Sequence, residues 1–136
     1  MLTRDQRYAG VVYEQVEAVG RHPEGIKKER YGSAAHKLPV LIRTAGLAQA
    51  LHFADARGGP EYALLLNHLA AALGIGGSAG REAKDVLLDE SRSRQLGSYM
   101  RLTGEALAAL LWYKRFAQSI LDVTAAADDE AGGGQR

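Results

Sequence analysis

Apolar residues recur every three or four positions along most of this 136-residue chain, and no stretch alternates apolar and polar residues with period two. The first spacing places side chains on one face of an α-helix, whereas the second is typical of a half-buried strand. Hydrophobic residues make up 46% of the sequence, which is enough for one buried core. The pattern therefore predicts an all-α fold, a compact single-domain bundle of about six helices.

Capping residues, glycines and prolines predict where the helices begin and end. Thr3 and Gln6 form a capping-box pattern that begins a first helix, which Gly20 ends together with Pro23. A second helix is predicted from about residue 24 to 37, with a break or kink at Pro39 because proline lacks a backbone donor. The other helices are predicted at 39–56, where Gly46 weakens the run, at 60–73, at 81–89, as a short segment capped by Ser91 or Ser93, and from Thr103 to about Val123.

The predicted domain spans residues 1–124. The last residues, 125–136, form an acidic, glycine-rich tail that is predicted to be disordered, and residues 74–80 (GIGGSAG) are predicted to be a flexible loop. The chain contains no cysteine, and charged residues stand where a signal peptide would be apolar. No apolar tract reaches the roughly 20 residues needed to cross a bilayer. We therefore expect a cytoplasmic protein without disulfides.

The predicted last helix carries apolar residues on two opposite sides. A helix that packs only against its own domain needs one apolar stripe. Two interpretations remain open: a central helix buried on both sides, or a helix that keeps one side for a partner. At 100° per residue, one side holds Leu107, Leu110, Leu111, Ala117 and Leu121, and the other, the candidate partner interface, holds Trp112, Tyr113, Phe116 and Ile120.

Basic residues gather on the predicted second helix. Lys27, Arg30 and Lys37 lie within about 80° of one another, Lys28 lies further round, and Arg43 follows on the next helix. Such a ridge suits phosphate groups, because each neutralised phosphate releases a condensed counterion. A basic run is also typical of a solvated helix face, and the net charge of +1 neither supports nor excludes RNA.

The sequence indicates no catalytic or cofactor-binding motif. Ser33 and His36 lie one helical turn apart, but no orienting carboxylate or oxyanion hole is indicated nearby. The four histidines lack the spacing of metal ligands, and the paired carboxylates lack the Glu-x-x-His motifs of a di-metal bundle. The glycine loop lacks the Lys-Ser/Thr of a phosphate-binding loop. We therefore expect a protein that is not an enzyme, with no catalytic residue, no cofactor and no metal.

Two stretches, 31–53 and 99–117, resemble the signature regions of one protein family. The first holds Tyr31-Gly32-Ser33, Leu38-Pro39-Val40-Leu41-Ile42 and Gly46-Leu47-Ala48-Gln49-Ala50-Leu51-His52-Phe53. The second holds Tyr99 and Thr103 ahead of Leu111-Trp112-Tyr113-Lys114-Arg115-Phe116-Ala117. In combination these motifs resemble the small-subunit family of the type III-B CRISPR effector, the Cmr complex. One departure is Ala45, where the family pattern would have asparagine.

The resemblance implies a non-catalytic structural subunit of a ribonucleoprotein used in RNA silencing and antiviral defence. Small subunits of this family stack into an inner filament and help to hold the target RNA along the guide RNA. The implied partners are the backbone and large Cmr subunits, further copies of the chain, and the guide RNA–target RNA duplex, with no membrane and no small-molecule substrate. Charge and helical position, not the resemblance, select the residues expected to contact RNA: Lys27, Lys28, Arg30, Lys37, Arg43, Lys114 and Arg115.

Two other classes of function remain open at this point. A helical protein-interaction subunit without direct nucleic-acid contact would assemble independently of salt. A small carboxylate-metal enzyme would contain iron or manganese when purified.

Overall fold

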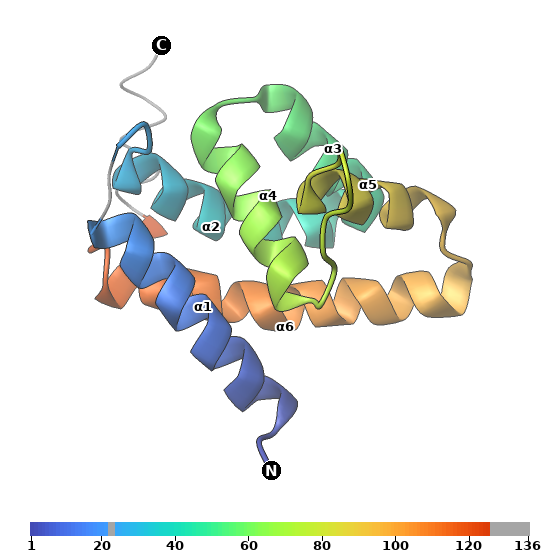
Figure 1. The fold of residues 1–136 in the computed structure, drawn as a ribbon, viewed down its shortest axis with the longest axis horizontal. Helices are drawn as coiled ribbons and strands as arrows, with labels where there is room; N and C mark the ends of the chain where they lie inside the picture. The colour runs from blue at the N-terminus through green and yellow to red at the C-terminus, as the bar shows by residue number, and fades with distance from the viewer. Residues whose placement is uncertain (22–23, 126–136) are drawn as a thin grey trace.

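Figure 1 shows the computed structural model, in which six α-helices pack into one bundle. The structure describes residues 1–21 and 24–125, so nearly all of the predicted tail, 126–136, lies outside the described residues. Within the described ranges no strand forms, and the glycine loop holds only an isolated bridge between Ser78 and Arg81. The predicted all-α bundle of about six helices is confirmed. The helices are α1 (Arg4–Arg21), α2 (Lys28–Ala45), α3 (Leu47–Arg57), α4 (Pro60–Ala72), α5 (Ala83–Ser93) and α6 (Leu96–Ser119).

The longest helix, α6, runs along one side of the bundle (orange in Figure 1). It packs mainly against α1 and α2, while α4 packs against α5 and α2. Figure 1 shows α1 crossing the C-terminal half of α6, and the N-terminal half of α6 extending beyond this crossing. None of the helices in the described part of the chain combines the length and the apolar character of a membrane span.

The capping box at the start of α1 is confirmed. The backbone N–H of Gln6 donates to Thr3 Oγ1 at 3.1 Å, and the backbone N–H of Thr3 donates to Gln6 Oε1 at 2.8 Å. These bonds satisfy donors that the first turn of a helix leaves without intrahelical partners. The apolar face that follows is buried at Tyr8, Val12, Val16 and Val19.

The second helix continues through Pro39, so the predicted break at this residue is wrong. Proline inside a helix costs about 3 kcal/mol. Leu38 and Ile42 are buried together with Pro39, and full burial of a leucine or isoleucine side chain contributes about 1.5–3 kcal/mol. The burial therefore offsets the lost backbone hydrogen bond. The chain breaks instead at Gly46, whose φ of 89° favours a residue without a side chain.

The helix boundaries near α5 and α6 also differ from the prediction. Ser91 and Ser93 lie inside α5 and begin no further helix in the described chain. α6 begins at Leu96, well before the predicted Thr103, and ends at residue 119. The hydroxyl of Ser91 donates to the carbonyl of Leu88 at 2.6 Å, and that of Thr103 donates to the carbonyl of Tyr99 at 2.9 Å. Hydroxyl side chains can bond back to the preceding turn as well as cap a helix, so these two residues fit inside helices.

A buried polar network joins four helices. Tyr113 of α6 donates its hydroxyl to Gln15 Oε1 at 2.5 Å, and Gln15 Nε2 donates to the main-chain carbonyl of His68 at 3.1 Å. The hydroxyl of Tyr31 lies 2.7 Å from His68 Nδ1. Burial raises the pKa of Tyr31 and of Tyr113 and lowers the pKa of His68 to about 4. At pH 7 the imidazole is therefore neutral, and its Nδ1 can accept a hydrogen bond from the hydroxyl of Tyr31.

Residues 120–123, which we call the C-terminal strap, fold back onto α2. Asp122 adopts a φ of 59°, and the N–H of Val123 donates to a carbonyl in the last turns of α6 at 2.9 Å. His36 Nε2 donates to the carbonyl of Val123 at 2.9 Å. A Cβ placed on Gly32 would lie only 2.6 Å from Val123 Cβ. Gly32 thus provides the space that the strap occupies.

Candidate nucleic-acid interface

The basic residues that were predicted on two helices lie along one. Because α2 continues to Ala45, the positions from Lys28 to Arg43 follow one helix for about 22 Å, and Lys27 is the extended N-cap residue just before it. On this continuous helix Arg43 lies about 120° around the axis from Lys37, so it is not part of the same ridge. We therefore define the basic ridge as Lys27, Arg30 and Lys37. Lys27 and Arg30 are exposed, as are Lys28 and Arg43 to the sides of the ridge, and Lys37 is half-buried.

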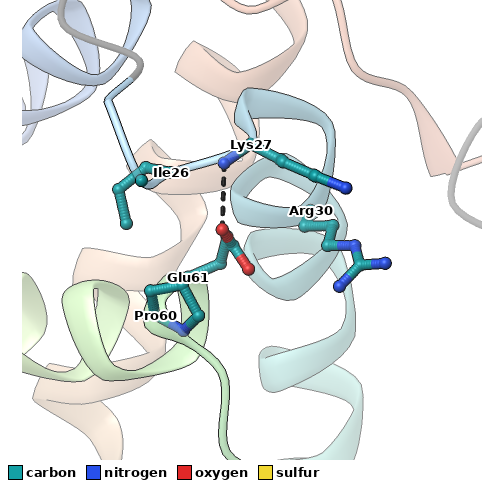
Figure 2. Close-up of a pocket in the computed structure, with 6 residues that line it drawn as sticks. Ile26, Lys27, Arg30, Pro60 and Glu61 are labelled. Carbon is teal, nitrogen blue, oxygen red and sulfur yellow. Dashed lines mark hydrogen bonds between the residues drawn. The ribbon is translucent and has the colours of Figure 1, made fainter.

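The N-terminal end of the basic ridge borders an open pocket of about 440 Å³. Glu61 comes from the first turn of α4, is 5% exposed, and accepts the backbone N–H of Lys27 at 2.9 Å. Figure 2 shows that the side chains of Lys27 and Arg30 extend away from this carboxylate. Glu61 therefore stabilises the start of α2, while the two basic side chains lie at the surface. The pocket is lined by Gly25, Ile26, Lys27, Arg30, Pro60 and Glu61.

We expect Glu61→Ala to lower the free energy of unfolding by about 1–2 kcal/mol, because a backbone donor at the start of α2 loses its partner. Glu61→Gln keeps an acceptor oxygen and should lose less than half as much. Urea unfolding followed by circular dichroism measures both variants. An equal loss in the two variants would show that the hydrogen bond to Lys27 is not what Glu61 contributes.

Lys114 and Arg115 are neighbours on α6 but lie about 100° apart around the helix axis. The guanidinium of Arg115 lies 5.4 Å from the centre of the Trp112 ring, and Trp112 stacks on Phe116 with ring centroids 5.6 Å apart. Phe116 meets Tyr13 of α1 edge-on, with ring centroids 5.4 Å apart. Arg115 is thus part of an aromatic cluster that α1 and α6 share. Lys114 is exposed on another side of α6.

The predicted partner interface on α6 needs one correction. Tyr113 is fully buried and hydrogen-bonded to Gln15, so it offers no surface to a partner. Trp112, Phe116 and Ile120 are half-buried and pack against the core. α6 therefore packs into the core on its Tyr113 side, and of the predicted interface only these three residues keep any exposed surface.

Basic residues near α5 are neutralised within the domain. Lys84 Nζ lies 2.9 Å from Asp55 Oδ1, and this hydrogen bond raises the pKa of the lysine. Arg81 lies 2.6 Å from Asp89, and this hydrogen bond lowers the pKa of the carboxyl group. The other arginines of α5 and its C-terminal end also pair with carboxylates of that helix. By contrast, no carboxylate in the described ranges lies within ion-pair distance of Lys27, Lys28, Arg43 or Lys114.

Ser33 and His36 are buried one turn apart in α2. Ser33 Oγ and His36 Nδ1 have no hydrogen-bond partner among the residues that the structure describes, and His36 uses its other ring nitrogen to hold the strap. A serine nucleophile needs a base within hydrogen-bond reach. The pair therefore belongs to the packing between α2 and the strap. In the same part of the chain, no three histidine, aspartate or glutamate side chains are grouped as metal ligands.

Several exposed apolar residues on α6 were missed by the sequence pattern. Leu96 is 73% exposed, Met100 is 63% exposed, and Leu111, which was expected on the buried stripe, is 43% exposed. The first two lay outside the predicted helix. Once α6 is extended back to Leu96, these residues and Leu107 fall within about 60° of one another. The spacing of these apolar residues therefore indicates a shared helix face, but only when the helix is correctly started at Leu96.

Comparison with known proteins assigns the family. The family described as CRISPR-associated protein (Cas_Cmr5) matches residues 4–120. The chain belongs to the Cmr5 family. Over 122 residues it is 42% identical to the CRISPR system Cmr subunit Cmr5 of Thermus thermophilus, covering 90% of this chain and 99% of that protein. The crystal structure of a CRISPR-associated Cmr5 family protein from the same species matches with a TM-score of 0.74 and 41% sequence identity, covering 88% of this chain and 98% of the other.

The motifs that resemble the Cmr5 family have structural roles in this member. Tyr31 contacts His68 in the polar network, and Gly32 leaves space for the strap. Gly46 breaks the chain between α2 and α3. The hydroxyl of Tyr99 accepts the backbone N–H of Ala48 at 3.0 Å and so satisfies a donor in the first turn of α3. The motifs therefore specify how α2, α3, α6 and the strap pack together.

Proposed function

We propose that this chain is a non-catalytic structural subunit of a type III-B CRISPR effector, the Cmr complex, in the cytoplasm. Membership of the Cmr5 family and the 42% identity to a Cmr subunit support this function. In the complex, copies of the chain stack into an inner filament that holds the target RNA along the guide RNA. Its partners are the backbone and large subunits, other copies of itself, and the guide RNA–target RNA duplex.

The basic ridge is the surface that we propose for RNA contact. The position of the ridge along one continuous helix and its N-cap residue is the observation that supports this choice, because it places the cationic side chains along one element. Sequence is read by base pairing with the guide, so the protein needs only contacts to the shape and phosphates of the duplex. A few weak contacts per subunit suffice when several subunits bind the same RNA. Lys28, Arg43, Lys114 and Arg115 lie on other sides of α2 and α6 and are secondary candidates.

We expect alanine at Lys27, Arg30 and Lys37 together to weaken binding of target RNA by the assembled complex. The slope of log affinity against log salt concentration should fall by about 2, since each lost single-strand phosphate contact removes about 0.7. Fluorescence anisotropy with labelled target RNA at several salt concentrations measures the slope. Alanine at three exposed arginines elsewhere is the matched control and should leave the slope unchanged: Arg4, Arg7 and Arg57. An unchanged slope in the ridge variant would place the RNA contact elsewhere.

A second candidate function is a helical protein-interaction subunit with no direct nucleic-acid contact. The exposed apolar residues of α6 favour it, because Leu96, Met100 and Leu111 are 73%, 63% and 43% exposed. This function predicts salt-insensitive assembly and no RNA cross-links to α2. The ridge experiment therefore distinguishes the two candidates.

A further inference from the structure

We propose that α6 binds an acidic amphipathic helix of a neighbouring protein subunit along its exposed apolar side. This inference rests on the proposed function, since it concerns how the chain attaches to its assembly. We call the surface the α6 stripe and define it as Leu96, Met100, Leu107 and Leu111. Three of these residues are 73%, 63% and 43% exposed, in the order Leu96, Met100, Leu111, and Leu107 is half-buried.

The geometry of the α6 stripe matches the way in which helices bind in grooves or pack in pairs. Its residues are separated by four, seven and four positions, so they follow one side of the helix for about 22 Å. Apolar residues at this spacing are the ones that a second helix covers when two helices pack along their length. A partner helix of about four turns would cover the whole stripe.

Gly104 provides a notch at one edge of the α6 stripe, about halfway along its length. It lies between Met100 and Leu107, and a Cβ added to it would have no atom within 4 Å. A glycine inside a helix costs about 1 kcal/mol relative to alanine, and at this position the fold of the chain has no need of it. A glycine does allow another molecule to approach the backbone closely. We infer that a side chain of the partner helix sits against Gly104.

The charges around the α6 stripe select the kind of partner. Lys114 and Arg115 flank the stripe on α6, and both are exposed. Acidic residues flanking the apolar face of a partner helix would complement these cations. The stripe of a second copy is flanked by cations and by no carboxylate of α6, so it lacks the complementary charge, and RNA offers little apolar surface to cover leucine and methionine.

The same helix places its acidic residue away from the stripe. Glu105 lies near Tyr8 of α1, where its charge contributes to the raised pKa of that tyrosine, after the larger effect of burial. Glu105 is thus on the side of α6 that α1 covers, and α6 contains no other acidic residue. The exposed side of α6 therefore combines apolar and basic residues, which is the complement of an acidic amphipathic helix.

Binding of the full-length chain to an effector reconstituted from the other Cmr subunits and a guide RNA tests the proposal. Biolayer interferometry measures the Kd of this association. Leu111→Lys should raise the Kd about tenfold or more, because it places a charge in the apolar contact. Gly104→Ala should raise the Kd about threefold to tenfold although it stabilises the isolated chain, because the added methyl group fills the notch. Gly10→Ala on α1 is the matched control, since a Cβ there also has no atom within 4 Å, and it should leave the Kd unchanged.

A photo-crosslinking residue, p-benzoylphenylalanine, placed at Met100 identifies what covers the stripe. We expect a cross-link to an acidic helical peptide of another subunit, found by mass spectrometry of the assembled complex. A cross-link to RNA or to a second copy of the chain would overturn the proposal, as would unchanged Kd values for both Leu111→Lys and Gly104→Ala. If the wild-type chain did not bind the effector at all, the proposed function itself would fail. Normal binding with unaffected variants would refute the α6 stripe alone.

Discussion

Replacing Gly32 by alanine is expected to lower the free energy of unfolding by about 2–3 kcal/mol, because the methyl group has no space. A Cβ at this position would lie 2.6 Å from Val123 Cβ and 2.8 Å from each of its methyl carbons. Val123 is only 2% exposed, so its side chain cannot turn away into solvent. The strap would have to move, and the hydrogen bond from His36 to the Val123 carbonyl would be lost. Urea unfolding of the purified variant measures the loss.

Two variants show whether the strap is the cause. Gly104→Ala makes the same chemical change in a helix where nothing lies within 4 Å, and it should raise the free energy of unfolding by about 0.5–1 kcal/mol. Val123→Gly removes the atoms that meet the new methyl group. Gly32→Ala and Val123→Gly should therefore be less destabilising together than the sum of their separate effects. Additive losses would contradict the role assigned to Gly32.

The second large effect is a loss of stability in mild acid that depends on His68. The pKa of His68 is lowered to about 4 in the folded protein by burial, from an ordinary value of 6.5. The unfolded chain therefore binds a proton first as the pH falls. Stability from the neutral ring is fully present above about pH 6.5 and is lost progressively down to about pH 4, by up to about 3 kcal/mol. Urea unfolding at a series of pH values measures how the free energy of unfolding falls with pH.

His68→Gln is the matched variant for the pH experiment. A glutamine carries no titrating group but offers a side-chain oxygen to the hydroxyl of Tyr31. The variant should unfold at a lower urea concentration at pH 7. Its free energy of unfolding should change much less between pH 6.5 and pH 4 than that of the wild type. Asp89 does not interfere, because its pKa is lowered from 3.8 and its contribution changes below this window. The same change with pH in both proteins would show that another group titrates.

Local signals in the sequence predicted helix boundaries well where residues that are neighbours in the sequence make the capping hydrogen bonds. The capping box of Thr3 and Gln6 works through neighbouring residues, and it begins α1 as predicted. Pro39 failed as a signal because burial of the side chains around it outweighs one lost backbone hydrogen bond. Ser91 failed as a cap because its hydroxyl bonds back to the carbonyl of Leu88 in the preceding turn. A local rule thus fails where tertiary packing or an alternative hydrogen bond supplies more free energy.

The candidate site was only partly predictable for a related reason. The ridge of Lys27, Arg30 and Lys37 was predictable because it depends on helical spacing alone. Arg43 was predicted on a separate helix, but it lies on the continuous α2 and away from the ridge. The burial of Tyr113 depends on Gln15, which is 98 residues away in the sequence. The strap likewise depends on His36, 87 residues from Val123. Which side of α6 remains exposed follows from such distant contacts, and a single sequence does not state them.

The pairing of α1 with α6 has a consequence for how the chain acquires its fold. The hydrogen bond from Tyr113 to Gln15 spans 98 residues, and α6 is the main partner of α1. Contacts between such distant segments slow folding, because the entropic cost of closing the long intervening loop arises before these contacts form. During synthesis, the apolar face of α1, with Val12 and Val16 fully buried in the final bundle, lacks its main cover until α6 has left the ribosome. The nascent chain therefore exposes to chaperones, and to other nascent chains, a surface that the finished protein conceals.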